Sequence, residues 1–269
     1  MSPLVLRLRA APEQRLDLSV LTPRGLVGKT EREIGDLELQ TTRRPVRVAD
    51  LFDVSMGNRE QIVFEGGSER FDCLGEAMSA GSILIEGDVG DRAGRRMAGG
   101  RLTINGAARN WAASGMTAGL IEIADDAGDH LGGSLAGEVQ GMSGGVVVVR
   151  GNAGERAGDR LRRGAVIIEG KAGDDAGSRM LAGTLIVRGA VGRRAGYLMR
   201  RGTIVLGAAI EDLGPTFVDC GVHDLTTFRL MANYVRDVSP RSAEVLRGPL
   251  RRFAGDTAIL GKGEIFVVA

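Results

Sequence analysis

The chain has 269 residues, enough for a buried core, and its net charge of +1 gives no overall field that would draw it to nucleic acid or to a membrane surface. Its two cysteines, Cys73 and Cys220, argue against a disulfide framework. No apolar run approaches membrane-spanning length, and Arg7 and Arg9 interrupt the N-terminal apolar residues, as a signal peptide would not. We therefore expect a cytoplasmic protein with no nucleic-acid or membrane partner.

Residues 1–61 carry no repeat. Apolar residues alternate over residues 4–8 and again over 16–18, a pattern that predicts short strands. Thr30 followed by Glu33 fits a capping box, in which the two side chains satisfy backbone N–H groups at the start of a helix. We expect a short helix over residues 31–35 and, for the whole segment 1–61, a small mixed α/β cap.

A strict repeat organises residues 62–207. Seven glycines recur at intervals of 19, 19, 26, 19, 19 and 19 residues: Gly81, Gly100, Gly119, Gly145, Gly164, Gly183 and Gly202. Three residues before each glycine stands a long apolar side chain: Met78, Met97, Met116, Met142, Leu161, Met180 and Met199. Each glycine is followed by a short apolar strand, and an insertion near residues 134–141 accounts for the one longer interval. Repeats of this length are typical of solenoids.

The residue types of the repeat predict a narrow column of stacked coils. Alternate side chains of a strand face opposite sides, so a pair such as Ile83 and Ile85 points inward. An Ala-Gly pair and the adaptable methionine fill the other sides, and corner glycines permit the positive φ of a sharp turn. We expect a mainly β protein, a right-handed parallel β-helix of about eight coils with mixed α/β caps, because a left-handed hexapeptide helix needs coils that are multiples of six.

The outward middle position of each strand is unusually apolar. Five of the seven residues in this row are apolar: Leu84, Thr103, Glu122, Val148, Ile167, Ile186 and Val205. The row has two interpretations, an ordinary exposed surface with β propensity or a covered face. We expect a covered face, in which the chain's own tail or another subunit packs on the apolar members of the row: Leu84, Val148, Ile167, Ile186 and Val205.

Residues 208–269 follow the last repeat. Apolar residues at 225, 228, 231 and 235 have helical spacing, and Asp224 is a plausible N-cap. Residues 258–260 and 264–268 have the pattern of strands. Solenoids need caps at their open ends, so we expect three segments, an N-terminal cap over 1–61, the β-helix over 62–207 and a C-terminal cap over 208–269.

No catalytic or metal-binding constellation is evident. His130 and His223 lie far apart and lack metal-ligand spacing. Asp125, Asp126 and Asp129 form the densest polar group beside His130, and a metal or acid–base site there is one interpretation. Solvated corner residues are the simpler one. We therefore name no catalytic and no metal-binding residue.

Arginines accumulate at the corners of the repeat. Those at equivalent positions two repeats apart should stack near one edge: Arg162, Arg163, Arg200 and Arg201. A solvated face balanced by aspartates is one interpretation, and a contact for a polyanionic cofactor or an acidic partner is the other. These four are our candidate cofactor- or partner-binding residues.

The repeat Gly87-x-x-Gly90-x-x-Ala93-Gly94-x-x-Met97 resembles the glycine-rich β-helix of the glutamate synthase C-terminal domain and of the C subunit of formylmethanofuran dehydrogenase. Further motifs lie in the flanks: Leu21-Thr22-Pro23, Gly28-Lys29-Thr30, Asp50-Leu51-Phe52-Asp53-Val54, Pro215-Thr216-Phe217, Gly255-Asp256 and Gly261-Lys262-Gly263-Glu264-Ile265. They resemble the dehydrogenase subunit and its bacterial relative, the C subunit of the formyltransferase/hydrolase complex.

The resemblance implies one-carbon metabolism from formaldehyde to formate. In such complexes a formyl group passes from tetrahydromethanopterin to a furan-type carrier, methanofuran or methylofuran, and is released as formate. The catalytic centres are assigned to other subunits, so the resemblance implies a non-catalytic subunit of a cytoplasmic hetero-oligomer, with no cofactor bound catalytically by this chain. Some furan carriers bear an oligoglutamate tail, which the four arginines would suit.

Three alternatives remain open. The first is the C subunit of an archaeal-type molybdenum or tungsten formylmethanofuran dehydrogenase. The second is a β-helix domain of an amidotransferase-like enzyme such as glutamate synthase, which would need attached catalytic domains. The third is a polysaccharide-active enzyme, which would need a carboxylate cluster on one outer face that the sequence does not reveal.

Overall fold

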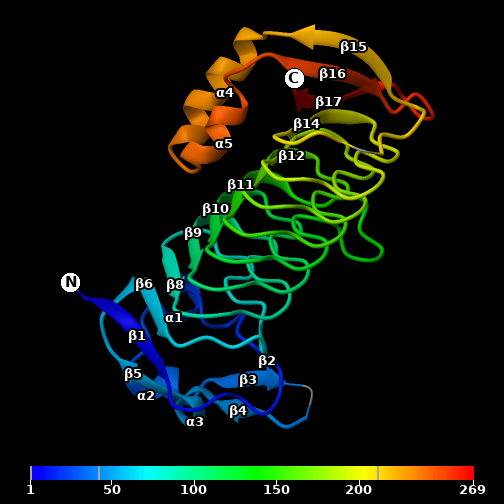
Figure 1. Ribbon diagram of the computed structural model, residues 1–269. Helices are drawn as coiled ribbons and strands as arrows, with labels where there is room; N and C mark the ends of the chain where they lie inside the picture. Colours follow the sequence, from blue (N-terminus) through cyan, green and yellow to red (C-terminus); the bar gives the residue numbers. More distant parts are fainter. Residues whose placement is uncertain (1, 42, 211) are drawn as a thin grey trace.

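The computed structural model describes residues 2–41, 43–210 and 212–269. Strands stack one upon another along the molecule, and between strands the chain runs round the far side of the stack before it returns (Figure 1). The N-terminal segment lies at one end of this stack and the C-terminal segment at the other (Figure 1). The repeat therefore forms the middle of the molecule, and the non-repetitive segments form its ends.

Most strands belong to one 13-stranded sheet in the order β15-β16-β17-β14-β13-β12-β11-β10-β9-β8-β6-β1-β5. Parallel neighbours in the repeat are β6 (Asn58–Glu65), β8 (Ser82–Ile85), β9 (Ala98–Ile104), β10 (Ala118–Ile123), β11 (Ser143–Val149), β12 (Arg163–Ile168), β13 (Thr184–Val187) and β14 (Arg201–Leu206). Antiparallel pairs within this sheet occur at its two ends. The expectation of a mainly β protein is confirmed.

A second line of parallel pairing runs along another side of the stack. It consists of single bridges that join Val89, Ala108, Ala127, Ala153, Ala172 and Val191 in succession. Each repeat therefore hydrogen-bonds to the next at two places, as coils wound about one axis must. The interior between the two lines is filled by one buried cluster that extends from β1 to β17. The methionines at 78, 97, 116, 180 and 199 are all buried in it, which confirms their expected interior position.

The paired glycines before each strand serve two different needs. At Gly99 an added Cβ would lie 2.2 Å from the carbonyl oxygen of Ser79, so the backbones of neighbouring repeats approach too closely for any side chain. The next residue, Gly100, has φ +81°, a conformation that costs an L-residue about 1–2 kcal/mol. This corner therefore requires glycine twice, once for space and once for φ.

Another corner adopts positive φ without glycine, contrary to our expectation that the corners rely on it. Seven equivalent residues have φ between 57° and 65°: Cys73, Arg92, Trp111, His130, Arg156, Asp175 and Arg194. Each of these conformations lets the backbone N–H reach a carbonyl of the next repeat. Arg92 donates to Asn110 at 2.8 Å, for example, and Trp111 donates to Asp129 at 2.8 Å. These hydrogen bonds between repeats offset the conformational cost.

The N-terminal segment comprises β1 (Pro3–Leu8), β2 (Leu16–Asp17), α1 (Pro23–Leu26), α2 (Glu31–Gly35), β3 (Glu38–Thr41), β4 (Val46–Arg47), α3 (Val48–Leu51) and β5 (Phe52–Ser55). β1 extends the large sheet beside β6, while β2, β3 and β4 form a second sheet with β7 (Phe71–Asp72). The capping box of Thr30 and Glu33 begins α2 as predicted. The segment is thus mixed α/β, and it closes one end of the stack.

The C-terminal segment comprises β15 (Val218–His223), α4 (Thr226–Arg236), α5 (Pro240–Val245), β16 (Leu250–Gly255) and β17 (Lys262–Val268). The predicted helix is α4, but its N-cap is Leu225 and not Asp224, whose carboxylate pairs with Arg229 at 2.5 Å. The predicted strand over 258–260 is wrong. These residues form a turn, because Asp256 accepts the N–H of Ala258 through its side chain and those of residues 259 and 261 through its carbonyl.

Candidate functional site

The polar groups that the sequence singled out at the corners are held in structural contacts. Asp126 Oδ1 accepts the backbone N–H of Asn152 at 2.6 Å, and Asp129 Oδ1 accepts that of Glu155 at 2.8 Å. His130 stacks on Trp111 with ring centroids 5.3 Å apart, and its burial lowers its pKa from the ordinary value. Over residues 2–41, 43–210 and 212–269, no three His, Cys, Asp or Glu side chains are grouped to hold a metal ion.

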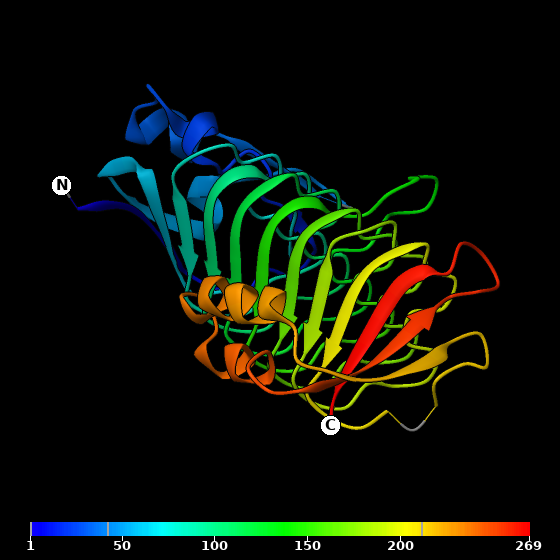
Figure 2. The same ribbon diagram turned by 90° about the horizontal axis from the view of Figure 1, so that it is seen from above.

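The apolar row follows one register line across the sheet. Strand pairing aligns Leu84, Thr103, Glu122, Val148, Ile167, Ile186 and Val205 in succession, and Phe266 of β17 follows Val205. The last four of the seven are fully buried in a second cluster that Phe228, Ala232 and Val235 of α4 complete. In Figure 2, α4 and α5 lie across the strands over this face. Leu84 differs, because it is half-buried and lies outside that cluster.

A polar contact fastens the two helices beside the buried row. Glu169 is buried at the end of β12, and it accepts a hydrogen bond from Ser239 Oγ at 2.7 Å. Arg150 pairs with the same carboxylate and donates from Nη2 to the carbonyl oxygen of Val238 at 2.8 Å. Ser239 also caps α5, because its Oγ accepts the N–H of Ser242 at 3.3 Å. The start of α5 is therefore tied to the sheet through one carboxylate.

The four candidate arginines are exposed and lie in two places. Arg163 and Arg201 begin β12 and β14, and strand pairing sets Lys262 beside Arg201. Arg162 and Arg200 instead line a surface groove of ≈ 550 Å³. The other lining residues of this groove, called the basic groove below, are Val139, Gln140, Arg160, Arg179, Leu181, Leu198 and Ile259.

Sequence reasoning missed Arg160 and Arg179, although a signal was present. The two are 19 residues apart, so they occupy the same position in successive repeats, two residues before the row of Arg162 and Arg200. Arg160 Nη1 donates to the carbonyl oxygen of Glu138 at 2.6 Å, and Arg162 Nη1 donates to Gln140 Oε1 at 2.6 Å. The inserted loop over residues 134–141 thus supplies neutral acceptors that hold two guanidinium groups in the groove.

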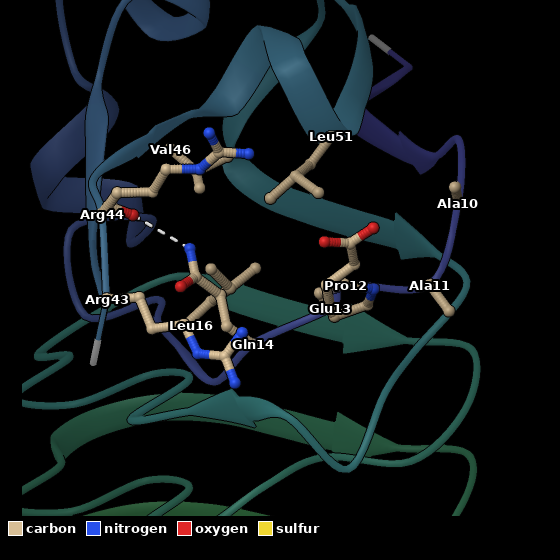
Figure 3. Close-up of a pocket in the computed structure, with 10 residues that line it drawn as sticks. All are labelled: Ala10, Ala11, Pro12, Glu13, Gln14, Leu16, Arg43, Arg44, Val46 and Leu51. Carbon is tan, nitrogen blue, oxygen red and sulfur yellow. Dashed lines mark hydrogen bonds between the residues drawn. The ribbon is translucent and has the colours of Figure 1, made fainter.

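A second cavity, of ≈ 590 Å³, lies in the N-terminal segment. Arg43 and Arg44 extend toward it from one side and Glu13 from the other, above apolar residues that include Leu16 and Leu51 (Figure 3). Gln14 Nε2 donates to the carbonyl oxygen of Arg44 at 2.9 Å and joins its two walls. Its ten lining residues contain no histidine, cysteine or serine, so they offer charge and apolar surface but no nucleophile paired with a base.

No protein-family model matches the chain. It is 47% identical over 264 residues to the C subunit of the formyltransferase/hydrolase complex Fhc of Methylorubrum extorquens, an alignment that covers 98% of this chain and 99% of that protein. It is 35% identical over 95 residues to the C subunit of molybdenum-containing formylmethanofuran dehydrogenase 1 of Methanosarcina barkeri, covering 34% of this chain and 32% of the relative.

A solved structure resembles the whole fold. It is the crystal structure of the formyltransferase/hydrolase complex FhcABCD from Methylorubrum extorquens in complex with methylofuran. One of its chains matches with a TM-score of 0.95 and 45% sequence identity, covering 98% of this chain and 99% of that one. The likeness includes both non-repetitive ends as well as the repeat.

Proposed function

Because the chain belongs to the family of the C subunit of the formyltransferase/hydrolase complex, we propose that it is a non-catalytic structural subunit of such a complex in tetrahydromethanopterin-linked one-carbon metabolism. The observation that carries the proposal is the match to that subunit over nearly the entire chain, in sequence and in fold. The archaeal dehydrogenase subunit is a weaker alternative, since its match covers about a third of the chain.

The non-catalytic role is supported by how the chain uses its polar groups. The corner aspartates accept backbone N–H groups, and His130 is stacked on Trp111. Burial raises the pKa of the Cys73 thiol, so the reactive thiolate is disfavoured. Other subunits of the complex would then carry the transferase and hydrolase chemistry, with a furan-type carrier and tetrahydromethanopterin as its one-carbon carriers. In the related complex the bound carrier is methylofuran.

The finer architecture is part of the same proposal. A right-handed parallel β-helix of about eight coils over residues 62–207, with caps over 1–61 and 208–269, is supported by the 19-residue spacing and by the two lines of parallel pairing. None of the helices in the described residues is long and apolar enough to cross a membrane. A cytoplasmic location stays a prediction.

Two surfaces are proposed for contacts within the complex. The exposed Arg162, Arg163, Arg200 and Arg201 would meet a polyanionic cofactor or an acidic partner. In the apolar row, the chain's own tail covers Val148, Ile167, Ile186 and Val205. Leu84, which the tail leaves uncovered, would be the member of that row available to a partner protein.

Reconstitution tests the non-catalytic role. We expect the purified chain alone to show no formyltransferase, formyl hydrolase or dehydrogenase turnover, because no nucleophile–base pair is assembled on it. Co-expression with the other three subunits from the same organism should give a stable complex with both the transferase and the hydrolase activity. Turnover by the isolated chain that persists after removal of trace partners would contradict the proposal.

A further inference from the structure

The basic groove crosses three successive repeats. The first contributes Arg160 and Arg162, the next contributes Arg179 and Leu181, and the third contributes Leu198 and Arg200. Neighbouring strands of a sheet lie about 4.8 Å apart, so Arg162 and Arg200, two repeats apart, have backbones about 10 Å apart. An extended peptide rises about 3.3 Å per residue, so about three residues of such a peptide span this distance.

The carboxylates near the groove are already engaged. Asp159 accepts from Arg179 through both oxygens, at 2.8 and 2.9 Å. Glu138 directs its carboxylate to Arg95 and Arg96, away from the groove that its carbonyl faces. Asp256 is buried and accepts two backbone N–H groups. No carboxylate lines the groove itself.

Three guanidinium groups in the groove are therefore available to an anion. Among residues 2–41, 43–210 and 212–269, no carboxylate lies within 4 Å of the guanidinium nitrogens of Arg160, Arg162 or Arg200. Arg160 and Arg162 are oriented by the neutral oxygens of Glu138 and Gln140, which each use one of five N–H donors. The groove is a positive surface whose donors are held in place before a ligand arrives.

Two apolar side chains flank these arginines on loops that belong to different parts of the chain. Val139, on the inserted loop, is 81% exposed, and Ile259, on the turn between β16 and β17, is 42% exposed. Tyr197 lies next to Leu198, and it lines an adjoining pocket that shares Arg179 and Leu198 with the groove. Exposed apolar residues together with arginine and tyrosine are typical of the centre of a protein–protein interface.

We propose that the basic groove docks an extended, acidic segment of another protein of the complex. Carboxylates of that segment would contact Arg162 and Arg200, and its apolar side chains would contact Val139 and Ile259. The inference rests on the proposed function, because it needs the chain to be a subunit. It assigns two of the four candidate arginines to a protein partner, since a small polycarboxylate would leave Val139 and Ile259 exposed.

The first experiment measures the affinity of the chain for its partners. The tagged chain is assembled with the other three subunits from the same organism, and the dissociation constant is measured at low and high salt. Arg162→Ser combined with Arg200→Ser should raise it about tenfold at about 0.05 M salt, and less at about 0.5 M, because salt screens the contact. The matched control replaces two other exposed arginines, Arg24→Ser with Arg247→Ser, and should leave the dissociation constant unchanged.

The second experiment identifies the occupant. A photo-crosslinking amino acid at position 139 or 259 of the assembled complex should capture one partner peptide that is rich in Asp and Glu. The same reagent at Val27, an exposed residue next to α1, should not capture that peptide. A crosslink to the furan carrier, or to a peptide without carboxylates, would overturn the assignment.

The outcomes separate the two proposals. If the wild-type chain does not assemble with the other three subunits, the subunit role fails and the groove assignment fails with it. If the wild-type chain assembles, and the double arginine variant has the wild-type dissociation constant at both salt concentrations, only the groove assignment fails.

Discussion

The two halves of the outer sheet face share one register and differ in what lies upon them. At the N-terminal half the row reads Leu84, Thr103 and Glu122, which remain partly exposed. At the other half, from Val148 to Val205, the same row is fully buried under α4 and α5. The backbone pairing is parallel throughout, so the stack itself needs no cover. The apolar residues of the second half are a response to the tail.

The polar residues beside the row differ in the same way. Glu86 and Glu169 follow the middle strand positions at the same offset, and both donate their backbone N–H to the preceding strand in the stack. Glu86 is exposed, whereas Glu169 is buried and bonded to Ser239. A single position in the repeat can thus be solvated surface at one end and an anchor for the tail at the other.

The largest expected effect comes from charging the covered half. Ile167→Asp with Ile186→Asp would place two carboxylates among apolar side chains without partners, which costs several kcal/mol. We expect the helices to detach and the free energy of unfolding to fall by that amount. Denaturant unfolding measures the loss, and limited proteolysis should cleave residues 224–249 of the variant first.

The uncovered half provides the matched control. Leu84→Asp with Thr103→Asp changes the same row where no helix covers it, so we expect a loss below about 1 kcal/mol, as for most surface substitutions. Equal losses for the two double variants would mean that the helices contribute nothing to the stability of this face.

Repetition explains why the sequence predicts the body of the molecule so well. A period of 19 residues aligns equivalent positions, so the buried methionines and the register of the outward row follow from spacing alone. The end segments lack this redundancy. The sequence favours Asp224 as the N-cap of α4, yet Leu225 occupies that position and Asp224 pairs with Arg229 instead. The short helix α5, which begins at Ser239-Pro240, has too few residues to show a periodic pattern.

The basic groove could be predicted only in part. Arg162 and Arg200 follow from the repeat, as do Arg160 and Arg179 when all positions are compared. The contribution of Gln140 does not follow, because it depends on how the inserted loop folds back onto the neighbouring repeat. Long-range contacts between an insertion and a repeat leave no local pattern in the sequence.

An intermediate effect is expected from the polar anchor of the tail. Glu169→Gln keeps the shape of the side chain but removes the charge that Arg150 and Ser239 contact, so we expect a loss of about 1–3 kcal/mol in the free energy of unfolding. Glu86→Gln, at the equivalent exposed position, should change it by less than about 0.5 kcal/mol. Hydrogen exchange of α4 and α5 should rise in the first variant alone. Unchanged protection of both helices would contradict an anchoring role for Glu169.

The smallest expected effect concerns a corner that neither cap touches. Asp175 accepts from Arg194 Nε at 2.8 Å, and this hydrogen bond and the charge of Arg194 lower the pKa of the carboxyl group. A lowered folded-state pKa means that the contact stabilises the protein fully above the unfolded-state pKa of about 3.9, and that the contribution disappears as pH falls through the folded-state value. Asp175→Asn should therefore reduce the free energy of unfolding by less than about 1 kcal/mol at neutral pH, since Arg194 is largely exposed. Wild type and variant should converge as the pH is lowered below about 4. A difference that stays constant from about pH 7 to about pH 2 would show that packing at this corner, and not the ion pair, is what the substitution disturbs.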